Sequence, residues 1–467
     1  MNARLLAVAA AVLAALLSGC DKGIAPDDSR AAEVDQQVRE KWGKPLAELD
    51  EVTLVVISPH NTDIEWEFSQ AFSLHHALKH GQRVHIEYRD VGGGGSAILR
   101  YLQNVYAASG TAGIDIVWGG GEDSFQRLAD EGLLEPLTLD DDVLENIPAD
   151  FGGLAMYDPQ RRWCGSAVSG FGFLYNAPLL KSLAREPPQT WEDLGGAEYF
   201  DLVGLADPMQ SGSAAAAYEM IVQSAEDWPS GWAKLLGILA NAKRFYEGAS
   251  GAADAPVSGE TAVAACIDFY GAIRVAKYPE VLVYVSPKRG TAFNADPIAI
   301  LKNPPSGELA RRFVDFVLSR RGQALWALPP GAEDGPVRAA LGRQPIRKDV
   351  YELYAGNLSP WVVNPYETGQ AMEIDRKLWR ESFPVLRALV WTAAVSNREG
   401  LQAAKKKLIE TDFAPSRLAE FNRLPGNVDS RDELAGVAER LGDKVQADLI
   451  LTEWTTFFRE KYQRVAE

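Results

Sequence analysis

Cysteine and histidine are scarce in this sequence. Three cysteines and five histidines occur among 467 residues, and their spacing does not match that of a metal cage. The sequence also lacks a nucleophile elbow and a pair of carboxylates placed for acid–base chemistry. We therefore predict a protein that is not an enzyme and that holds no metal and no cofactor.

Positive charge is in deficit as well. Lysine and arginine number 47 against 64 aspartate and glutamate residues, which gives a net charge of −17. Such a balance disfavours binding of nucleic acid, or of anionic lipid through the folded surface. It still allows a local positive site for an anion. The length exceeds what one compact core usually holds and predicts two or three domains.

The chain begins with a short apolar run, Leu5–Leu17, which follows Arg4 and is too short to span a membrane. Leu17-Ser18-Gly19-Cys20 comes next and resembles the lipobox of bacterial lipoproteins. We expect residues 1–19 to be a signal peptide, Cys20 to carry a lipid anchor and residues 20–50 to be a tether. The protein would then be exported and anchored on the periplasmic or cell-surface side of a membrane. The alternative is an ordinary secretory signal.

The other two cysteines are Cys164 and Cys266. In an exported protein they could form a disulfide. Two buried thiols are the alternative, because the sequence does not fix the distance between their Cα atoms.

A strand, a polar or glycine-rich loop and then a helix follow one another three times in the first third of the chain. This alternation predicts an α/β fold with a parallel sheet covered by helices. Ligands bind beyond the carboxyl ends of the strands in such sheets. The strands and their loops are Thr53–Ile57 with Ser58–Asn61, 84–88 with Gly92–Ser96, and 114–118 with Gly119–Gly121.

The alternating pattern ends near Tyr351. Residues 371–395, 401–409 and 432–462 have helical periodicity instead. We therefore predict a helical C-terminal extension over residues 351–467, whose role the sequence does not give.

The order of these segments resembles that of the extracellular solute-binding proteins of bacterial ABC importers. Within family 1 of these proteins, the similarity is to lipoprotein members of the cluster that binds ferric ion, phosphonate or sugar phosphate. It covers about Val52 to Tyr351. The matching segments are the lipobox, Ser58-Pro59-His60, Ile114–Gly121, Gly132–Leu137, Gly172–Asn176, Thr190–Leu194, Asp207–Ser213, Ala265–Tyr270 and Phe313–Gln323.

The resemblance implies a type II periplasmic-binding-protein fold, in which hinge strands join two α/β lobes and the ligand lies between them. Lobe one would comprise residues 51–167 and 287–350, and lobe two residues 168–286. The chain would cross between the lobes near Ser166–Gly170 and near Val285–Lys288. We expect a monomer that delivers its solute to a membrane-embedded ABC permease.

Ser211-Gly212-Ser213 is the clearest candidate for binding an anion. It precedes an alanine-rich helix, whose first N–H groups lack helical partners and carry the positive end of the helix dipole. A phosphate or carboxylate oxygen fits there. The alternative is a simple N-cap, since serine is a favoured cap residue, and the family resemblance favours the anion.

Ser58 and His60 occupy the matching loop of the other lobe. A serine hydroxyl and an imidazole N–H can both donate to an oxyanion. His60 could instead close the turn after Pro59 through a structural hydrogen bond. It could also be a metal ligand, because ferric members of the family place a histidine near here. We favour a hydrogen-bond donor to an anion.

Two glycine-rich loops could bring backbone N–H groups close to a ligand. The candidates are Gly94, Gly95 and Ser96 in one loop and Gly120 and Gly121 in the other. Flexible surface loops are the alternative. Neither loop has the spacing or the lysine of a dinucleotide-binding or Walker motif.

Asp268 and Tyr270 end a strand of lobe two. Asp268 could accept hydrogen bonds from a sugar or an amine, and Tyr270 could form one wall of the site. A salt bridge or a helix cap is the alternative for Asp268. Ferric-binding relatives carry two adjacent tyrosines in this neighbourhood, so the single Tyr270 weakens an iron-binding interpretation.

These patterns predict the solute-binding lipoprotein of an ABC importer. Its ligand would be a small oxyanion-bearing solute, such as an organic phosphate, a sugar phosphate or a phosphonate. One alternative is a ferric-iron binding subunit of an importer. The other is a ligand-sensing or docking lipoprotein without transport.

Overall fold

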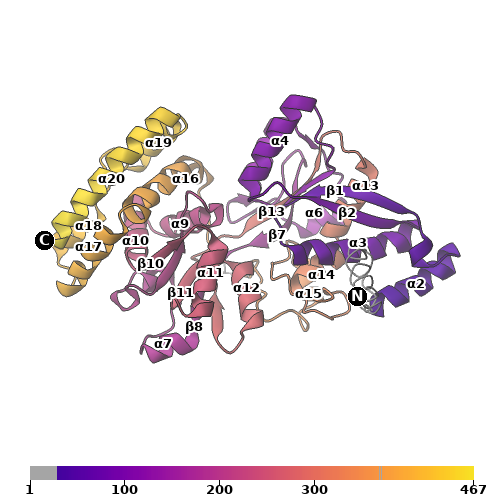
Figure 1. Ribbon diagram of the computed structural model, residues 1–467, viewed down its shortest axis with the longest axis horizontal. Helices are drawn as coiled ribbons and strands as arrows, with labels where there is room; N and C mark the ends of the chain where they lie inside the picture. Colours follow the sequence, from indigo (N-terminus) through magenta and orange to yellow (C-terminus); the bar gives the residue numbers. More distant parts are fainter. Residues whose placement is uncertain (1–28, 368, 370) are drawn as a thin grey trace, which may run out of the picture.

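The computed structural model describes residues 29–367, 369 and 371–467, and Figure 1 shows how they are arranged. The signal peptide and the lipid anchor on Cys20 lie outside these residues and stay predictions. Within the described ranges, no helix is both long enough and apolar enough to cross a membrane.

Lobe one is built on a mixed sheet with the strand order β2-β1-β3-β13-β4, and β7 pairs with β13. β1 is parallel to β2 and β3, so the loops after these three strands leave the same edge of the sheet. β13 is antiparallel to β3, β4 and β7. The strands are β1 (Glu51–Ile57), β2 (Arg83–Arg89), β3 (Ile116–Trp118), β4 (Leu134–Glu135), β7 (Cys164–Ser169) and β13 (Asn294–Leu301), and β5 (Asp150–Phe151) and β6 (Leu154–Ala155) form a separate hairpin.

Helices cover this sheet because their apolar faces match its buried side chains. Leu54 and Val56 of β1 and Phe68 and Phe72 of α3 are all fully buried. The α3 helix begins after Asn61, whose side chain accepts a hydrogen bond from the Ile64 N–H at 3.0 Å. The helices are α3 (Thr62–His80), α4 (Gly95–Ser109), α5 (Glu122–Asp130), α6 (Asp141–Asn146), α13 (Gly307–Leu318), α14 (Arg320–Ala327) and α15 (Lys348–Leu353).

Lobe two has a second sheet with the order β10-β9-β11-β8-β12. β9 is parallel to β10 and β11, whereas β8 is antiparallel to β11 and β12. The strands are β8 (Phe171–Asn176), β9 (Val203–Ala206), β10 (Ala242–Tyr246), β11 (Val263–Ile267) and β12 (Leu282–Val285). The helices are α7 (Ala177–Ser182), α8 (Trp191–Leu194), α9 (Gly212–Gln223), α10 (Trp228–Ala240), α11 (Ala249–Ser258) and α12 (Asp268–Lys277), with a short 3₁₀ turn at Ala197–Tyr199.

Two segments connect the sheets of the lobes. Gly170 stands between β7 of lobe one and β8 of lobe two. Residues 286–293 lead from β12 of lobe two back to β13 of lobe one. Figure 1 shows β7 and β13 at the junction between the lobes. The fold is therefore the two-lobed α/β arrangement that the sequence predicts.

Part of the segment assigned above to a tether is folded onto lobe one. Helix α2 (Ser29–Trp42) and the 3₁₀ turn Leu46–Glu48 lie before β1. Val34 and Val38 of α2 pack against Leu74 and Ala77 of α3. The apolar spacing of α2 is the physical reason, since a helix with a buried stripe needs a partner surface.

The C-terminal extension also begins later than residue 351. Tyr366 donates from its hydroxyl to the Ile346 carbonyl, and Gln344 bridges to Val168 of β7. Residues up to Tyr366 therefore pack with lobe one and the junction. The helices that follow are α16 (Arg376–Val390), α17 (Arg398–Glu410), α18 (Pro415–Asn422), α19 (Leu434–Leu441) and α20 (Lys444–Ala466), with a π-helical turn at Trp391–Val395 and a 3₁₀ turn at Arg431–Glu433.

These C-terminal helices cover lobe two on its side away from lobe one, where they appear in orange and yellow in Figure 1. The Trp232 ring of α10 packs 5.9 Å from the Phe458 ring of α20, measured between centroids. Trp228 of α10 donates to the Val428 carbonyl at 2.9 Å. Buried aromatic contacts of this kind make the extension part of the fold of lobe two.

The two cysteines in the described part of the chain are buried and free. Cys164 lies in β7 of lobe one and Cys266 in β11 of lobe two. Burial raises the pKa of each thiol to about 12. Of the two alternatives left open by the sequence, the structure has the pair of buried thiols.

Candidate ligand-binding site

Three helices of lobe one begin at the edge of the sheet where β1, β2 and β3 end. Their caps are Asn61 for α3, Gly94 for α4 and Gly121 for α5. The loops are in close contact: a Cβ atom on Gly95 would lie 2.4 Å from the Gly120 carbonyl oxygen. Gly120 also has a φ of +112°, a backbone conformation that residues other than glycine rarely adopt. Gly95 and Gly120 are thus packed against each other, and helix N-termini with their positive dipole ends converge here.

His60 is held inside lobe one by Asp296 at the start of β13. The His60 Nε2 atom lies 2.7 Å from Asp296 Oδ2, and the side chain is 1% exposed. Its ring meets the Trp118 ring edge-on at 4.7 Å between centroids. Burial lowers the pKa of His60, and the neighbouring Asp296 opposes this shift. A neutral ring then carries its proton on Nε2, where Asp296 accepts it.

This arrangement bears on the predicted role of His60 as a donor. Nδ1 of His60 is buried and has no hydrogen-bond partner within the described part of the chain. In the neutral ring Nδ1 is an acceptor, and it becomes a donor only when the ring is protonated. The turn after Pro59 is closed by Ser58, whose Oγ accepts from the His60 backbone N–H at 3.1 Å. The structural role considered for His60 thus falls to Ser58.

Arg343 is a buried cation at the junction of the lobes that was not predicted from the sequence. Its NH1 atom lies 2.9 Å from Asp296 Oδ2 of lobe one. Its guanidinium also lies over the Phe269 ring of lobe two, 4.1 Å from the ring centroid. Arg343 Nε is buried without a partner among the residues that the structure describes. Burial alone would raise the pKa of Asp296, but the charge of Arg343 and the hydrogen bond from His60 hold it below its ordinary value.

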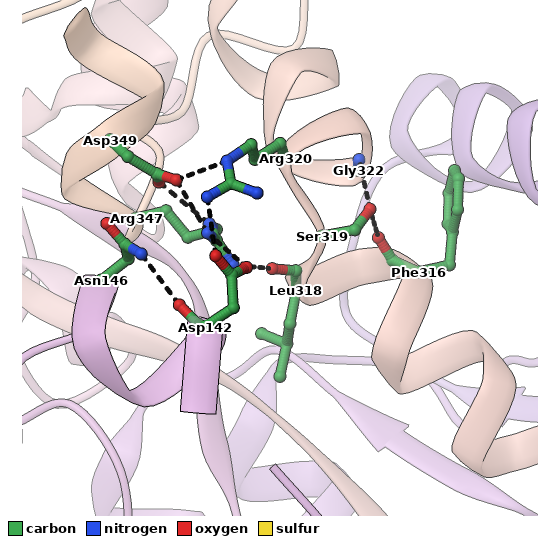
Figure 2. Close-up of polar contacts among 9 residues, drawn as sticks. All are labelled: Asp142, Asn146, Phe316, Leu318, Ser319, Arg320, Gly322, Arg347 and Asp349. Atoms are coloured by element: carbon green, nitrogen blue, oxygen red, sulfur yellow. Dashed lines mark hydrogen bonds and ion pairs between the residues drawn. The ribbon is translucent and has the colours of Figure 1, made fainter. Parts of the chain in front are cut away.

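Arg347 fixes the segment that carries Arg343. This second arginine is fully buried and lies between the carboxylates of Asp142 and Asp349, at 2.9 and 2.8 Å. It also donates to the Leu318 carbonyl at 3.3 Å. Figure 2 shows Arg347 at the centre of this cluster, with Arg320 bonded to the same two carboxylates. A segment anchored in this way presents Arg343 at a defined place.

Ser211 and Ser213 lie at the N-terminus of α9, as predicted. Ser211 is the N-cap, and its Oγ accepts from the Ala214 N–H at 3.3 Å. The two hydroxyl oxygens are 3.2 Å apart. A Cβ atom on Gly212 would meet nothing within 4 Å. The N-cap alternative is therefore present in the structure, and anion binding by this segment stays a prediction.

A small pocket of lobe two lies beside Ser213. Strand ends and helix starts form its walls, and most of the lining is apolar. The lining residues are Phe171, Ala206, Ser213, Ala214, Ala217, Tyr218, Ala249, Ala265, Cys266 and Ile267. Since Ile267 directly precedes Asp268, this pocket connects the serine segment with the predicted residues at the end of β11.

Asp268, the first residue of α12, accepts backbone hydrogen bonds at the first crossing between the lobes. Its Oδ2 accepts from the Gly170 N–H at 3.0 Å and its Oδ1 from the Phe269 N–H at 2.8 Å. Burial raises the pKa of Asp268 to about 6. The ring of Tyr270 packs 4.4 Å from the Phe269 ring. Asp268 thus has a structural role at this crossing, although the N-cap of α12 is Ile267, and its contact with a solute stays a prediction.

Glu122, the first residue of α5 after Gly121, carries a largely buried carboxyl that was not predicted from the sequence. Burial raises the pKa of its carboxyl to about 7. Within the described residues its Oε2 atom is buried without a hydrogen-bond partner. A carboxyl that is partly protonated at neutral pH can both donate and accept. Its position after a glycine loop was the one sequence signal that could have identified it.

Comparison with known proteins shows which family part of the chain resembles. A family model described as bacterial extracellular solute-binding protein matches residues 113–334. Over these residues the chain is similar to the bacterial extracellular solute-binding proteins. This family consists of binding proteins, in agreement with the prediction that the chain is not an enzyme. Among the described residues, no group of three or more His, Cys, Asp or Glu side chains is placed to hold a metal ion.

Curated relatives of this chain match only part of its length. It is 31% identical over 185 residues to the phosphoglycerate transport regulatory protein PgtC of Salmonella typhimurium, a match that covers 40% of this chain and 46% of PgtC. An uncharacterized protein of Haemophilus influenzae is 27% identical over 218 residues, with 45% and 60% covered. The chain thus spans about half the length of the curated relatives it matches.

Solved structures show that the fold is shared. The periplasmic binding protein AfuA of Actinobacillus pleuropneumoniae, bound to fructose-6-phosphate, is 20% identical with a TM-score of 0.52 and covers 78% of this chain and 99% of its own. Iron-bound HitA of Pseudomonas aeruginosa is 18% identical with a TM-score of 0.54, at 73% and 99% coverage. One of these two similar structures holds a sugar phosphate and the other holds iron, so the fold alone does not give the ligand.

Proposed function

We propose that this protein captures a small organic phosphate between its lobes and delivers it to an ABC importer. The observation that carries the proposal is the buried Arg343, which contacts Asp296 of lobe one and Phe269 of lobe two and has a free Nε atom within the described part of the chain. A guanidinium N–H that faces no protein acceptor suits a phosphate or carboxylate oxygen.

The groups around Arg343 leave a positive electrostatic potential that favours an anion. Arg343 and Asp296 neutralise each other, so the remaining positive potential comes from the N-termini of α3, α4 and α5 in lobe one and of α9 in lobe two. An incoming phosphate would also favour protonation of His60, which would then donate through Nδ1. These groups belong to both lobes, and a ligand that contacts both stabilises the closed form.

The relatives support a phosphorylated solute. PgtC is named for phosphoglycerate transport, and AfuA was solved with fructose-6-phosphate. Ferric iron remains the alternative within the same class, since HitA binds iron. Iron fits this chain less well: Phe269 stands beside the single Tyr270, and a buried guanidinium lies on the Phe269 ring. A cation at that place repels a ferric ion.

A ligand panel tests the proposal. Thermal and urea unfolding would be followed with 3-phosphoglycerate, fructose 6-phosphate, the unphosphorylated glycerate and fructose, and ferric citrate. A phosphate ester at a hundred times its dissociation constant should add about 2.7 kcal/mol of stability. Stabilisation by ferric citrate alone, or equal stabilisation by the sugars without phosphate, would refute it.

The double variant Ser211→Ala, Ser213→Ala tests the anion segment. We expect it to weaken binding of the stabilising ester at least tenfold. Ser319→Ala is the matched control, because Ser319 caps α14 in the same way, through a hydrogen bond from the Gly322 N–H at 3.1 Å. Each cap loss lowers stability by about 1 kcal/mol. Equal affinities in the double variant and the control would show that this segment does not contribute to ligand binding.

A ligand-sensing or docking lipoprotein without transport is the second candidate. PgtC is named as a transport regulatory protein. In addition, Val445 and Leu449 are exposed on α20, one turn apart. Cells that carry Val445→Ser, Leu449→Ser would be assayed for uptake and for the transcriptional response to the solute. Loss of the response with intact uptake would favour sensing, and loss of neither would remove this surface from consideration.

A further inference from the structure

The C-terminal extension is joined to both lobes by a short strap, Met372–Arg376. The Met372 N–H donates to the Thr291 carbonyl in the second crossing at 2.9 Å. The Ile374 N–H donates to the Gly152 carbonyl of lobe one at 2.9 Å. The Asp375 N–H donates to Gln223 Oε1 of α9, in lobe two, also at 2.9 Å. The strap is thus a third connection between the lobes.

The β5–β6 hairpin of lobe one is shaped to receive this strap. A Cβ atom on Gly153 would lie 2.2 Å from the Ile374 carbonyl oxygen, and one on Gly152 would lie 2.8 Å from that of Met372. Arg376 forms an ion pair with Asp150 of the same hairpin at 2.5 Å. The start of α16 is therefore fixed against lobe one before the helix reaches lobe two.

Helix α16 then contacts the segment that leads to the serines of α9. Arg387 donates from Nε to the Pro208 carbonyl at 2.8 Å and from NH2 to the Met209 carbonyl at 2.9 Å. The two carbonyls belong to a turn in which Asp207 accepts from the Ser211 N–H at 2.8 Å. A planar guanidinium that holds two successive carbonyls fixes the orientation of both peptide planes.

Nearer its N-terminus, α16 also forms a hydrogen bond with helix α9 itself. The Ser382 hydroxyl donates to Glu219 Oε1 at 2.5 Å. Burial raises the pKa of Glu219 to about 7. Because α9 carries Ser211 at its N-terminus, the extension contacts both the turn before the serine segment and the helix after it.

We propose that Arg387 is a positioning residue for solute binding, through which the C-terminal extension sets the shape of the segment Asp207–Ser213. This inference rests on the proposed function, because it takes Ser211 and Ser213 as ligand contacts. Without Arg387 the two carbonyls are released and the turn gains conformational freedom. Binding must then order the turn, which lowers the affinity for the solute.

The test compares Arg387→Gln, Arg387→Lys and Arg380→Gln. Arg380 is exposed on the same helix, so its variant makes the same charge change away from the turn. Titration calorimetry would measure the dissociation constant for 3-phosphoglycerate at a temperature where circular dichroism shows every variant folded. We expect at least a tenfold loss for Arg387→Gln, an intermediate loss for Arg387→Lys, which can reach one carbonyl, and less than a twofold change for Arg380→Gln.

Hydrogen exchange of the ligand-free protein supplies a second readout. The amides of Asp207–Ser213 should exchange faster in Arg387→Gln than in Arg380→Gln, while those of α3 stay unchanged. If the wild type binds 3-phosphoglycerate and Arg387→Gln binds it equally well, or if the exchange of this segment does not change, the positioning role is wrong. If the wild type binds neither 3-phosphoglycerate nor fructose 6-phosphate, the proposed function fails, whereas the exchange still reports whether Arg387 holds the turn.

Discussion

His60 Nε2 lies 2.7 Å from Asp296 Oδ2, although 236 residues separate the two in the chain. Asp296 also accepts from the Gly120 N–H through Oδ1 at 3.1 Å and pairs with Arg343. One buried carboxylate therefore holds the loop after β1, the loop after β3 and the arginine at the lobe junction. The first two predictions follow from this carboxylate.

Replacing Asp296 by asparagine should destabilise the protein strongly. The substitution keeps the shape but leaves the charge of Arg343 buried without its partner, which costs about 3 kcal/mol or more. Urea unfolding at pH 7 would measure the change. The control is Glu308→Gln, which removes the carboxylate from an exposed pair with Arg312 and should change stability by about 1 kcal/mol or less. A similar small effect for both variants would contradict a central role for Asp296.

The substitution Gly119→Ala should displace the His60 side chain directly. Gly119 has a φ of +87°, and a Cβ atom there would lie 2.7 Å from His60 Nε2. Gly113→Ala is the matched control, because its φ is +63° and nothing lies within 4 Å of its Cβ position. Both variants carry backbone strain of about 1 kcal/mol, and only the first displaces the imidazole. We expect a lower urea midpoint and weaker solute binding for Gly119→Ala. Equal urea midpoints and equal affinities would show that the His60 ring can move without loss of stability or of binding.

The carboxyl of Glu219 should make stability fall as the pH rises. Burial raises its pKa from the ordinary 4.5 to about 7. Between these two values the folded protein keeps a proton that the unfolded chain has released, so raising the pH favours unfolding. Glu219→Gln removes this loss, and the gain above pH 7 is up to about 3 kcal/mol.

The measurement for Glu219 is urea unfolding of wild type and Glu219→Gln at several pH values from 4.5 to 8. The two stability curves should diverge with rising pH and run parallel above about 7. Glu410→Gln, at an exposed position of α17, serves as control and should follow the wild type. Parallel curves for Glu219→Gln over the whole range would mean that burial does not shift this carboxyl.

The buried thiols should be unreactive in the folded protein. The pKa of Cys164 and of Cys266 is raised to about 12 by burial, and the thiolate is the reactive form. A Cys20→Ser variant treated with iodoacetamide at pH 8 should stay unmodified when folded and gain two carbamidomethyl groups in guanidinium chloride. Intact mass spectrometry reads both states. Rapid modification of the folded protein, or a mass that reveals a disulfide, would contradict the structure.

The sequence alone determined the local features of this protein. Short-range rules fixed the strand, loop and helix order, because apolar periodicity and glycine positions depend on neighbouring residues. Ser211 was identified in the same way, since an N-cap is defined by the three residues after it. The family resemblance then supplied the two lobes, because the order of such segments along the chain is characteristic.

The tertiary structure decided the electrostatic partners. Arg343 had no distinguishing pattern in the sequence, and its meaning comes from Asp296 on one side and Phe269 on the other. Arg387 likewise gained a role only when α16 was placed against Pro208 and Met209. Pairing of buried charges depends on which distant segments meet after folding. Its free energy is the Coulomb attraction offset by the cost of desolvation, and a linear sequence displays neither.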